Sequence, residues 1–121
     1  GLTVFLCIGE SLKIKEEGKT KEFLKKQLDV NLKDVEDLSN LYISYEPIWS
    51  IGSTPPSNEE IEDIVKYIKS LFKKDVRVLY GGGVNEKNIE ELNKIPDING
   101  YLIGGASIIP EKFIKIIEVT K

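Results

Sequence analysis

The sequence predicts an α/β protein built on a parallel β-sheet. Short apolar runs alternate with longer amphipathic stretches along the 121 residues, in the order βαβαβαβα. The apolar runs start near residues 3, 41, 76 and 100, and each gap is long enough for a helix. A strand–helix–strand unit places its two strands parallel, with a right-handed crossover. Such units form either a small doubly wound sheet or half of a (β/α)8 barrel, and periodicity alone does not separate the two.

The first part of the chain contains two predicted strands and one predicted helix. Residues 3–8 are apolar and rich in β-branched and aromatic side chains, which is typical of a strand buried on both faces. A helix is expected after Gly18, with Thr20 available as its cap. Residues 41–45 form the second apolar run, and Pro47 ends it.

The clearest helix signal follows residue 56. Ser57 and Glu60 have the spacing of a capping box, in which each side chain accepts a hydrogen bond from the other residue's backbone N–H. The apolar residues behind them recur at the spacing of an amphipathic helix. These residues are Ile61, Ile64, Val65, Ile68, Leu71 and Phe72.

Two further strand–helix pairs complete the pattern. Residues 76–80 and 101–103 are predicted strands that end at glycines. Asn85 is placed to cap a short helix after the first of them. The last helix is expected to have Pro110 in its first turn, where a missing N–H has no cost. Its apolar face is predicted to hold Phe113, Ile116 and Ile117.

Composition argues against several classes of function. The chain has 17 Lys and Arg against 20 Asp and Glu, a net charge of −3, which disfavours nucleic acid as a partner. No apolar run approaches the roughly 18 residues of a membrane span, so we expect neither a membrane segment nor a signal peptide. With one cysteine and no histidine, we expect a cytoplasmic protein without an internal disulfide, a metal site or a cofactor. Because residue 1 is Gly and Met is absent, we expect a fragment.

Unusual residues follow all four predicted strands. In parallel α/β proteins the functional site lies at the carboxyl ends of the strands. The segments there are Cys7-Ile8-Gly9-Glu10, Tyr45-Glu46-Pro47-Ile48-Trp49-Ser50-Ile51-Gly52, Tyr80-Gly81-Gly82-Gly83-Val84-Asn85 and Gly104-Gly105-Ala106-Ser107. Within them, Cys7 is expected to be a buried inert thiol, and Trp49, the only tryptophan, a packing residue.

Glu46 is the candidate acid–base group. It follows an apolar strand and precedes a proline, so we expect its carboxylate to sit at the mouth of the sheet among apolar neighbours. Desolvation there would make it a better proton acceptor near neutral pH. A solvated glutamate in a loop is the alternative.

Two glycine clusters are candidate phosphate sites. Gly81–Gly83 and Gly104–Gly105 allow close approach of a ligand to the backbone, and a helix is predicted after each. Unpaired N–H groups at helix N-termini bind anions, and loops after the last two strands of a barrel often bind phosphate. Tight turns that only glycine fits are the alternative.

Taken in order, these segments resemble the C-terminal half of triosephosphate isomerases. Gly18-Lys19-Thr20 and Gln27-Leu28 also match, and Tyr45-Glu46-Pro47-Ile48-Trp49 is the most specific match. The resemblance covers residues 1–121 as one domain. It implies strands five to eight of a (β/α)8 TIM barrel, four parallel strands with their helices.

The resemblance implies a cofactor-free isomerase of glycolysis and gluconeogenesis. It would interconvert dihydroxyacetone phosphate and D-glyceraldehyde 3-phosphate through an enediolate, with Glu46 as the base. Backbone N–H groups of Gly52, Gly83, Gly104 and Gly105 would hold the substrate phosphate. This family is itself a standard example of a paired base and electrophile and of a closing lid.

The resemblance also implies a lid over residues 47–57. Closing it would exclude water from the enediolate. Tyr45, Trp49, Tyr80 and Glu10 would support the lid: Tyr80 would steady it when closed, and Trp49 would move with it toward Glu10.

Three positions depart from the family's pattern. Gly83 stands where Ser is usual, and Ser44 where a small apolar residue is usual. The far end of the lid reads Ser53-Thr54-Pro55-Pro56, where Gly and Lys are usual. Two prolines fix φ and remove two N–H donors, so this hinge must move differently.

The family's electrophilic His, and its substrate-binding Asn and Lys, come from the first half of the barrel. We therefore expect this chain to be inactive alone, and the complete protein to be a homodimer that takes a small phosphorylated triose. Two alternatives stay open: a non-catalytic half-barrel that binds phosphate or pairs with itself, and another phosphate-binding barrel enzyme with its base elsewhere than at Glu46.

Overall fold

A single parallel sheet organises residues 1–120, the part of the chain that this computed structural model describes. Its strands are β1 (Val4–Ile8), β2 (Leu41–Tyr45), β3 (Arg77–Gly81) and β4 (Gly100–Leu102). All neighbouring pairs are parallel, in the order β1-β2-β3-β4. A doubly wound sheet reverses its strand order at a switch point. The unbroken order seen here is that of a barrel segment.

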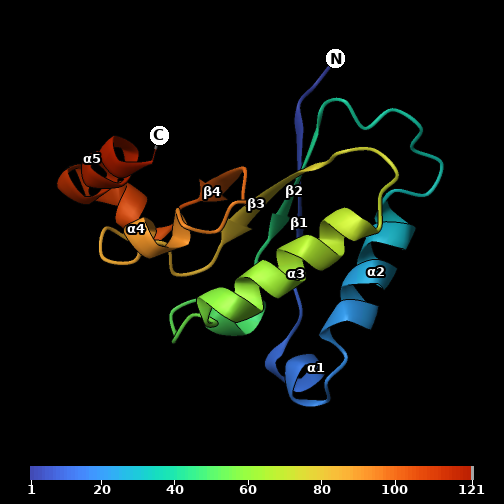
Figure 1. Cartoon of the computed structure of the whole chain (residues 1–121), viewed down its shortest axis with the longest axis horizontal. Helices are drawn as coiled ribbons and strands as arrows, with labels where there is room; N and C mark the ends of the chain where they lie inside the picture. The colour runs from blue at the N-terminus through green and yellow to red at the C-terminus, as the bar shows by residue number, and fades with distance from the viewer. Residues whose placement is uncertain (121) are drawn as a thin grey trace.

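The helices follow the strands in sequence. They are α1 (Leu12–Glu16), α2 (Thr20–Asn31), α3 (Asn58–Ser70), α4 (Ile89–Leu92) and α5 (Pro110–Val119), with short 3-10 turns η1 (Ile48–Ser50) and η2 (Gly105–Ile108). In Figure 1, α2 and α3 lie side by side across the sheet, and α4 and α5 lie beyond β4. No helix within residues 1–120 is long and apolar enough to cross a membrane.

The core lies between the sheet and the two longest helices. On α2 and α3 the core residues are apolar side chains at helical spacing, as the periodicity predicts. On β2 and β3 they are the side chains that point toward these helices. The most deeply buried include Leu24, Ile43, Val65, Ile68, Val78 and Ile89. Burial of this apolar surface holds the strand ends in place, which positions the loops described below.

Strand β1 does not have the two-sided burial predicted from its sequence. Val4 and Phe5 are 48% and 52% exposed, and within β1 only Ile8 is buried. Cys7 is exposed, which corrects the prediction of a buried thiol. Among the described strands, β1 pairs with β2 alone, so one edge and one face lack a partner there. An apolar sequence indicates that a strand can be buried. It does not show that the residues that would bury it belong to residues 1–120.

Helix ends agree with the sequence in part. The capping box is confirmed: Ser57 Oγ accepts from Glu60 N at 3.2 Å, and Glu60 Oε2 accepts from Ser57 N at 2.8 Å. Thr20 is instead the first residue of α2, whose N-cap is Lys19. Asn85 accepts from two backbone N–H groups in the turn before α4, but the N-cap of α4 is Asn88.

The last helix is less buried than its pattern predicts. Pro110 occupies its first turn, as expected. On the predicted apolar face Ile116 is 1% exposed, but Ile117 is 54% exposed. No described segment covers Ile117, so its hydropathy alone misled the prediction.

Replacing two buried serines by alanine should change the free energy of unfolding in opposite directions. The Ser44 hydroxyl finds no hydrogen-bond partner within residues 1–120, whereas Ser50 Oγ donates to the Pro47 carbonyl at 2.8 Å. Ser44→Ala should therefore raise the free energy of unfolding, by up to about 1 kcal/mol, because an unpaired buried hydroxyl is removed. Ser50→Ala should lower it by about 1 kcal/mol. Urea denaturation followed by circular dichroism measures both, and shifts of the same sign would contradict the assignment.

Candidate functional site

The carboxyl ends of β2, β3 and β4 meet around one cavity of about 590 Å³. Glu46 lines it from the end of β2, and Gly83 from the loop after β3. Gly104 and Gly105 line it from the segment after β4, and Gly52 from the loop over residues 47–57. The structure thus brings together all five residues that the sequence suggested as base and phosphate ligands.

Glu46 is seated by glycines on both neighbouring strands. Its backbone N–H donates to the Ile8 carbonyl at 2.8 Å. A Cβ on Gly9 would lie 1.7 Å from the Glu46 carbonyl oxygen, and a Cβ on Gly81 would lie 2.8 Å from Glu46 Cγ and Oε1. Only glycine leaves room for this packing. The Glu46 side chain is half-buried against the end of β3, at the edge of the cavity.

Cys7 of β1 is paired with Ser44 in the sheet, and its thiol contacts the Glu46 carboxylate. Although the residue is exposed overall, partial burial of its thiol and a hydrogen bond with the Glu46 carboxylate raise the pKa of Cys7 to about 11. The thiol therefore stays protonated at neutral pH, which argues against a nucleophilic role.

The glycines of the cavity differ in what surrounds them. Gly52 and Gly83 have φ values of 71° and 67°, where glycine is favoured by the backbone. A Cβ on Gly104 or Gly105 would meet no atom within 4 Å among the described residues, so both positions are open toward the cavity.

A charged pair also lines the cavity. Lys112 of α5 lies 3.5 Å from Glu86 Oε1. The pKa of the Glu86 carboxyl is lowered, first by a hydrogen bond from the backbone N–H of Glu86 itself and then by the charge of the Lys112 ammonium. Sequence reasoning missed this pair, because the two residues come from different elements and match no motif.

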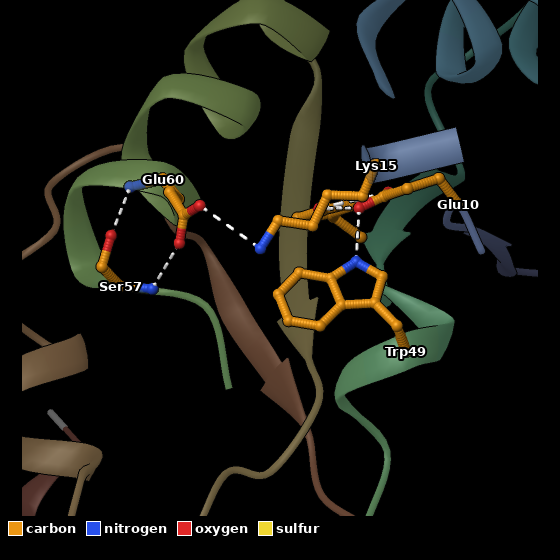
Figure 2. A network of polar contacts seen from close by, with 6 residues as sticks. Glu10, Lys15, Trp49, Ser57 and Glu60 are labelled. Carbon is orange, nitrogen blue, oxygen red and sulfur yellow. Dashed lines mark hydrogen bonds and ion pairs between the residues drawn. The ribbon is translucent and has the colours of Figure 1, made fainter. Parts of the chain in front are cut away.

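The start of the loop over residues 47–57 is held by a buried carboxylate. Glu10 is 1% exposed, and its carboxylate accepts from the Tyr45 hydroxyl at 2.9 Å and from Trp49 Nε1 at 2.8 Å (Figure 2). Burial, followed by the nearby Glu10 charge, raises the pKa of Tyr45, so it remains a donor. These hydrogen bonds join three of the residues that the resemblance groups as lid supports, and the indole already lies on Glu10 in this arrangement of the loop.

Lys15 joins this group to the far end of the same loop. Its ammonium lies 3.6 Å from the centroid of the Trp49 ring and 3.4 Å from Glu60 Oε1 (Figure 2). Lys15 belongs to α1, a short helix that the sequence analysis did not expect. A lysine in a polar stretch gives no signal of such contacts.

Tyr80 and Pro55 lie beside Gly82 and Gly83, two of the glycines that line the cavity after β3. The buried Tyr80 hydroxyl donates to the Gly82 carbonyl at 2.9 Å. A Cβ on Gly83 would lie 3.7 Å from Pro55 Cβ, so the hinge packs beside the position where the family usually has Ser. Within residues 1–120, no group of three or more His, Cys, Asp or Glu is placed to hold a metal ion.

Comparisons with known proteins agree with this geometry. Residues 1–120 match the family model described as triosephosphate isomerase. The triosephosphate isomerase of Mycoplasmopsis agalactiae is 43% identical over 119 residues, covering 98% of this chain and 46% of that protein. The one from Coprinopsis cinerea is 43% identical over 132 residues, covering 100% of this chain and 52% of that protein.

A solved structure gives the same picture. The triosephosphate isomerase from Bartonella henselae superposes with a TM-score of 0.85 at 32% identity, covering 98% of this chain and 50% of that chain. The predicted fold class, half of a (β/α)8 barrel, is confirmed. The chain spans about half the length of the relatives it matches.

Tyr80 should make the protein less stable at high pH. Burial raises the pKa of Tyr80 from 10.0 to about 12. The phenol is neutral in both states below about pH 10, and between pH 10 and 12 the unfolded chain loses its proton first, which costs about 2 to 3 kcal/mol of stability. Urea denaturation from pH 8 to 12 should show this loss, with a smaller slope in Tyr80→Phe. Equal slopes in the two proteins would contradict the assignment.

Proposed function

We propose that this chain, which belongs to the triosephosphate isomerase family, supplies the base, the phosphate site and the lid of an isomerase. The complete protein would interconvert dihydroxyacetone phosphate and D-glyceraldehyde 3-phosphate. The observation that carries the proposal is the shared cavity, where Glu46 faces the glycines of three loops.

Glu46 would act as the base. Its carboxylate takes a proton from the carbon beside the substrate carbonyl, and the electron pair of that bond moves toward the carbonyl oxygen to form an enediolate. The same carboxyl group then returns a proton to the former carbonyl carbon, while the proton of the neighbouring hydroxyl moves to the former carbonyl oxygen. Substrate and product are isomers, so the step balances without an oxidant or a cofactor.

The phosphate would be held by backbone N–H groups. Gly52, Gly83, Gly104 and Gly105 all line the cavity, and η2 begins at Gly105. Aligned peptide dipoles favour an anion at such a terminus without needing a side-chain cation. This arrangement would anchor one end of the substrate and place its carbon atoms near Glu46.

The loop over residues 47–57 would be the lid. Glu10, Tyr45 and Trp49 anchor its start through the hydrogen bonds described above, and Tyr80 lies beneath it at the cavity. Covering the enediolate excludes water, which would otherwise promote loss of the phosphate. We include a homodimeric complete protein and a cytoplasmic location in the same proposal.

A non-catalytic phosphate-binding module is the second candidate. One observation favours it: the chain has no histidine to polarise the substrate carbonyl, although the phosphate glycines are all present. A different barrel enzyme, with its base elsewhere, is not supported, because the family match spans residues 1–120.

The chain alone should show no measurable isomerase turnover. A positioned electrophile is worth about 10² to 10³ in rate, and the chain has none. Mixing it with the first half of the Mycoplasmopsis agalactiae relative should restore turnover, assayed in both directions after circular dichroism confirms folding. Turnover by the chain alone within about tenfold of an intact relative would contradict the need for a second half.

Glu46 should dominate activity in that complemented protein. Glu46→Asp withdraws the carboxylate by over an ångström, roughly one methylene, and should lower kcat on the order of 10²-fold. Glu90→Asp, on the exposed face of α4, is the matched control and should have no effect. Unchanged turnover in Glu46→Ala would rule Glu46 out as the base.

Gly104 should control phosphate binding without affecting the fold. A Cβ there meets no atom within 4 Å, so Gly104→Val adds bulk to the cavity and not to the core. Isothermal calorimetry with inorganic phosphate should show at least about tenfold weaker binding, and Gly104→Ala should weaken it less. Undiminished affinity in Gly104→Val would place the phosphate elsewhere.

A further inference from the structure

Gln27 makes a contact that the proposed function leaves unexplained. Its side-chain oxygen Oε1 accepts a hydrogen bond from the backbone N–H of Gly9 at 3.1 Å. Gln27 lies in α2, where Leu24 and Leu28 are 0% and 3% exposed, so the core holds this part of the helix in place. An amide on an anchored helix therefore fixes the backbone just after β1.

The sheet itself does not hold the Gly9 N–H. Pairing of β1 with β2 ends at Ile8 and Tyr45. Within residues 1–120, the acceptor of the Gly9 N–H is the Gln27 side chain and not a backbone carbonyl of the sheet. Without Gln27, this partly buried donor would have to find water instead.

Gly9 in turn lies against the backbone of Glu46. A Cβ on Gly9 would lie 1.7 Å from the Glu46 carbonyl oxygen and 2.6 Å from its carbonyl carbon, so the Gly9 Cα packs directly on that peptide group. On either side of this contact, Glu46 N donates to the Ile8 carbonyl at 2.8 Å, and Ile48 N donates to the Glu10 carbonyl at 3.1 Å. A shift of Gly9 would therefore move Glu46 as well, because close-packed groups transmit displacement.

We propose that Gln27 is a positioning residue that sets the place of the Glu46 carboxylate through Gly9. The inference rests on the proposed function only in that Glu46 is the base. The hydrogen bond fixes Gly9, Gly9 fixes the Glu46 backbone, and the Glu46 side chain at the cavity follows that backbone. A misplacement of about one ångström can cost on the order of 10²-fold in rate, so this support would matter for catalysis although Gln27 touches no substrate.

Cys7 gives a readout of the Glu46 carboxylate that needs no turnover. It is the only cysteine and it is exposed. Partial burial of the thiol and its hydrogen bond with the Glu46 carboxylate raise the pKa of Cys7 to about 11. The thiolate is the form that reacts with iodoacetamide, so alkylation at pH 8 is slow while the carboxylate stays in place. Glu46→Gln removes the carboxylate charge and should accelerate alkylation.

The experiment compares Gln27→Met with Asn99→Leu in the 121-residue chain, after circular dichroism confirms folding. Asn99 Oδ1 accepts from Val78 N at 2.9 Å, so it makes the same kind of bond near the start of β3, at the other end of the sheet from Glu46. Gln27→Met should make alkylation of Cys7 about threefold to tenfold faster at pH 8, and Asn99→Leu should not. Gln27→Glu keeps an acceptor at this position and should keep alkylation slow. Gln27→Asn, which withdraws the amide by one methylene, replaces Gln27→Met if that variant does not fold.

A double variant separates positioning from a general loosening of β1. In the Glu46→Gln background, Gln27→Met should have little further effect on alkylation, because the charge through which it acts is gone. Equal acceleration in both backgrounds would mean that Cys7 has only become more accessible, and it would overturn the proposal. An unchanged alkylation rate in Gln27→Met would overturn it too.

The complemented protein adds a second readout. There Gln27→Met should lower kcat by about tenfold or more and change KM by less than about twofold, because the glycines that would hold the phosphate lie on other loops. A change in KM alone would contradict a role through Glu46. Unchanged turnover in Glu46→Ala would count against the proposed function, while alkylation of the chain still decides whether Gln27 places the Glu46 carboxylate.

Discussion

The close approach of the Glu46 backbone to its neighbours is the constraint on which the rest of the site depends. The Glu46 carbonyl occupies the space that a Cβ on Gly9 would need, and its side chain lies where a Cβ on Gly81 would be. Strands β1, β2 and β3 can therefore come this close together only because a glycine lies on each side of Glu46. The convergence brings the loops after β2 and β3 to one cavity, and the loop over residues 47–57 begins at the next residue, Pro47.

Buried charge imposes the second constraint. A carboxylate as buried as Glu10 is tolerated only with strong donors, and the structure supplies Tyr45 and Trp49. These donors come from the end of β2 and from the loop over residues 47–57. The need to satisfy one carboxylate therefore fixes where this loop leaves the sheet, and Lys15 extends that order to α3. Stability and the position of the loop are coupled through the same atoms.

Local patterns predicted much of this architecture, and non-local contacts explain the failures. Capping chemistry and helical spacing identified α3, because both signals lie within a few residues of each other. The prediction that β1 and Ile117 are buried was wrong, because burial depends on segments that are distant in sequence and pack against a residue in the fold. The contacts of Lys15 were missed for the same reason. The difference between Gly83 and Gly104 is also invisible in sequence: Gly83 has a positive φ, whereas Gly104 is open toward the cavity.

The arrangement separates binding from chemistry. Contacts to the phosphate bind and position the substrate, but they raise the rate only where a base and an electrophile stand ready at the reacting carbons. In the proposed enzyme these contacts and the base lie on one chain segment, while polarisation of the carbonyl needs a group that the segment does not contain. In that proposed enzyme, phosphate affinity and lid position would be properties that this segment carries without turnover. Rate would require the carbonyl to be held between Glu46 and an electrophile. The junction with the rest of a barrel, along the edges of β1 and β4 that pair with no other described strand, would then be a determinant of catalysis.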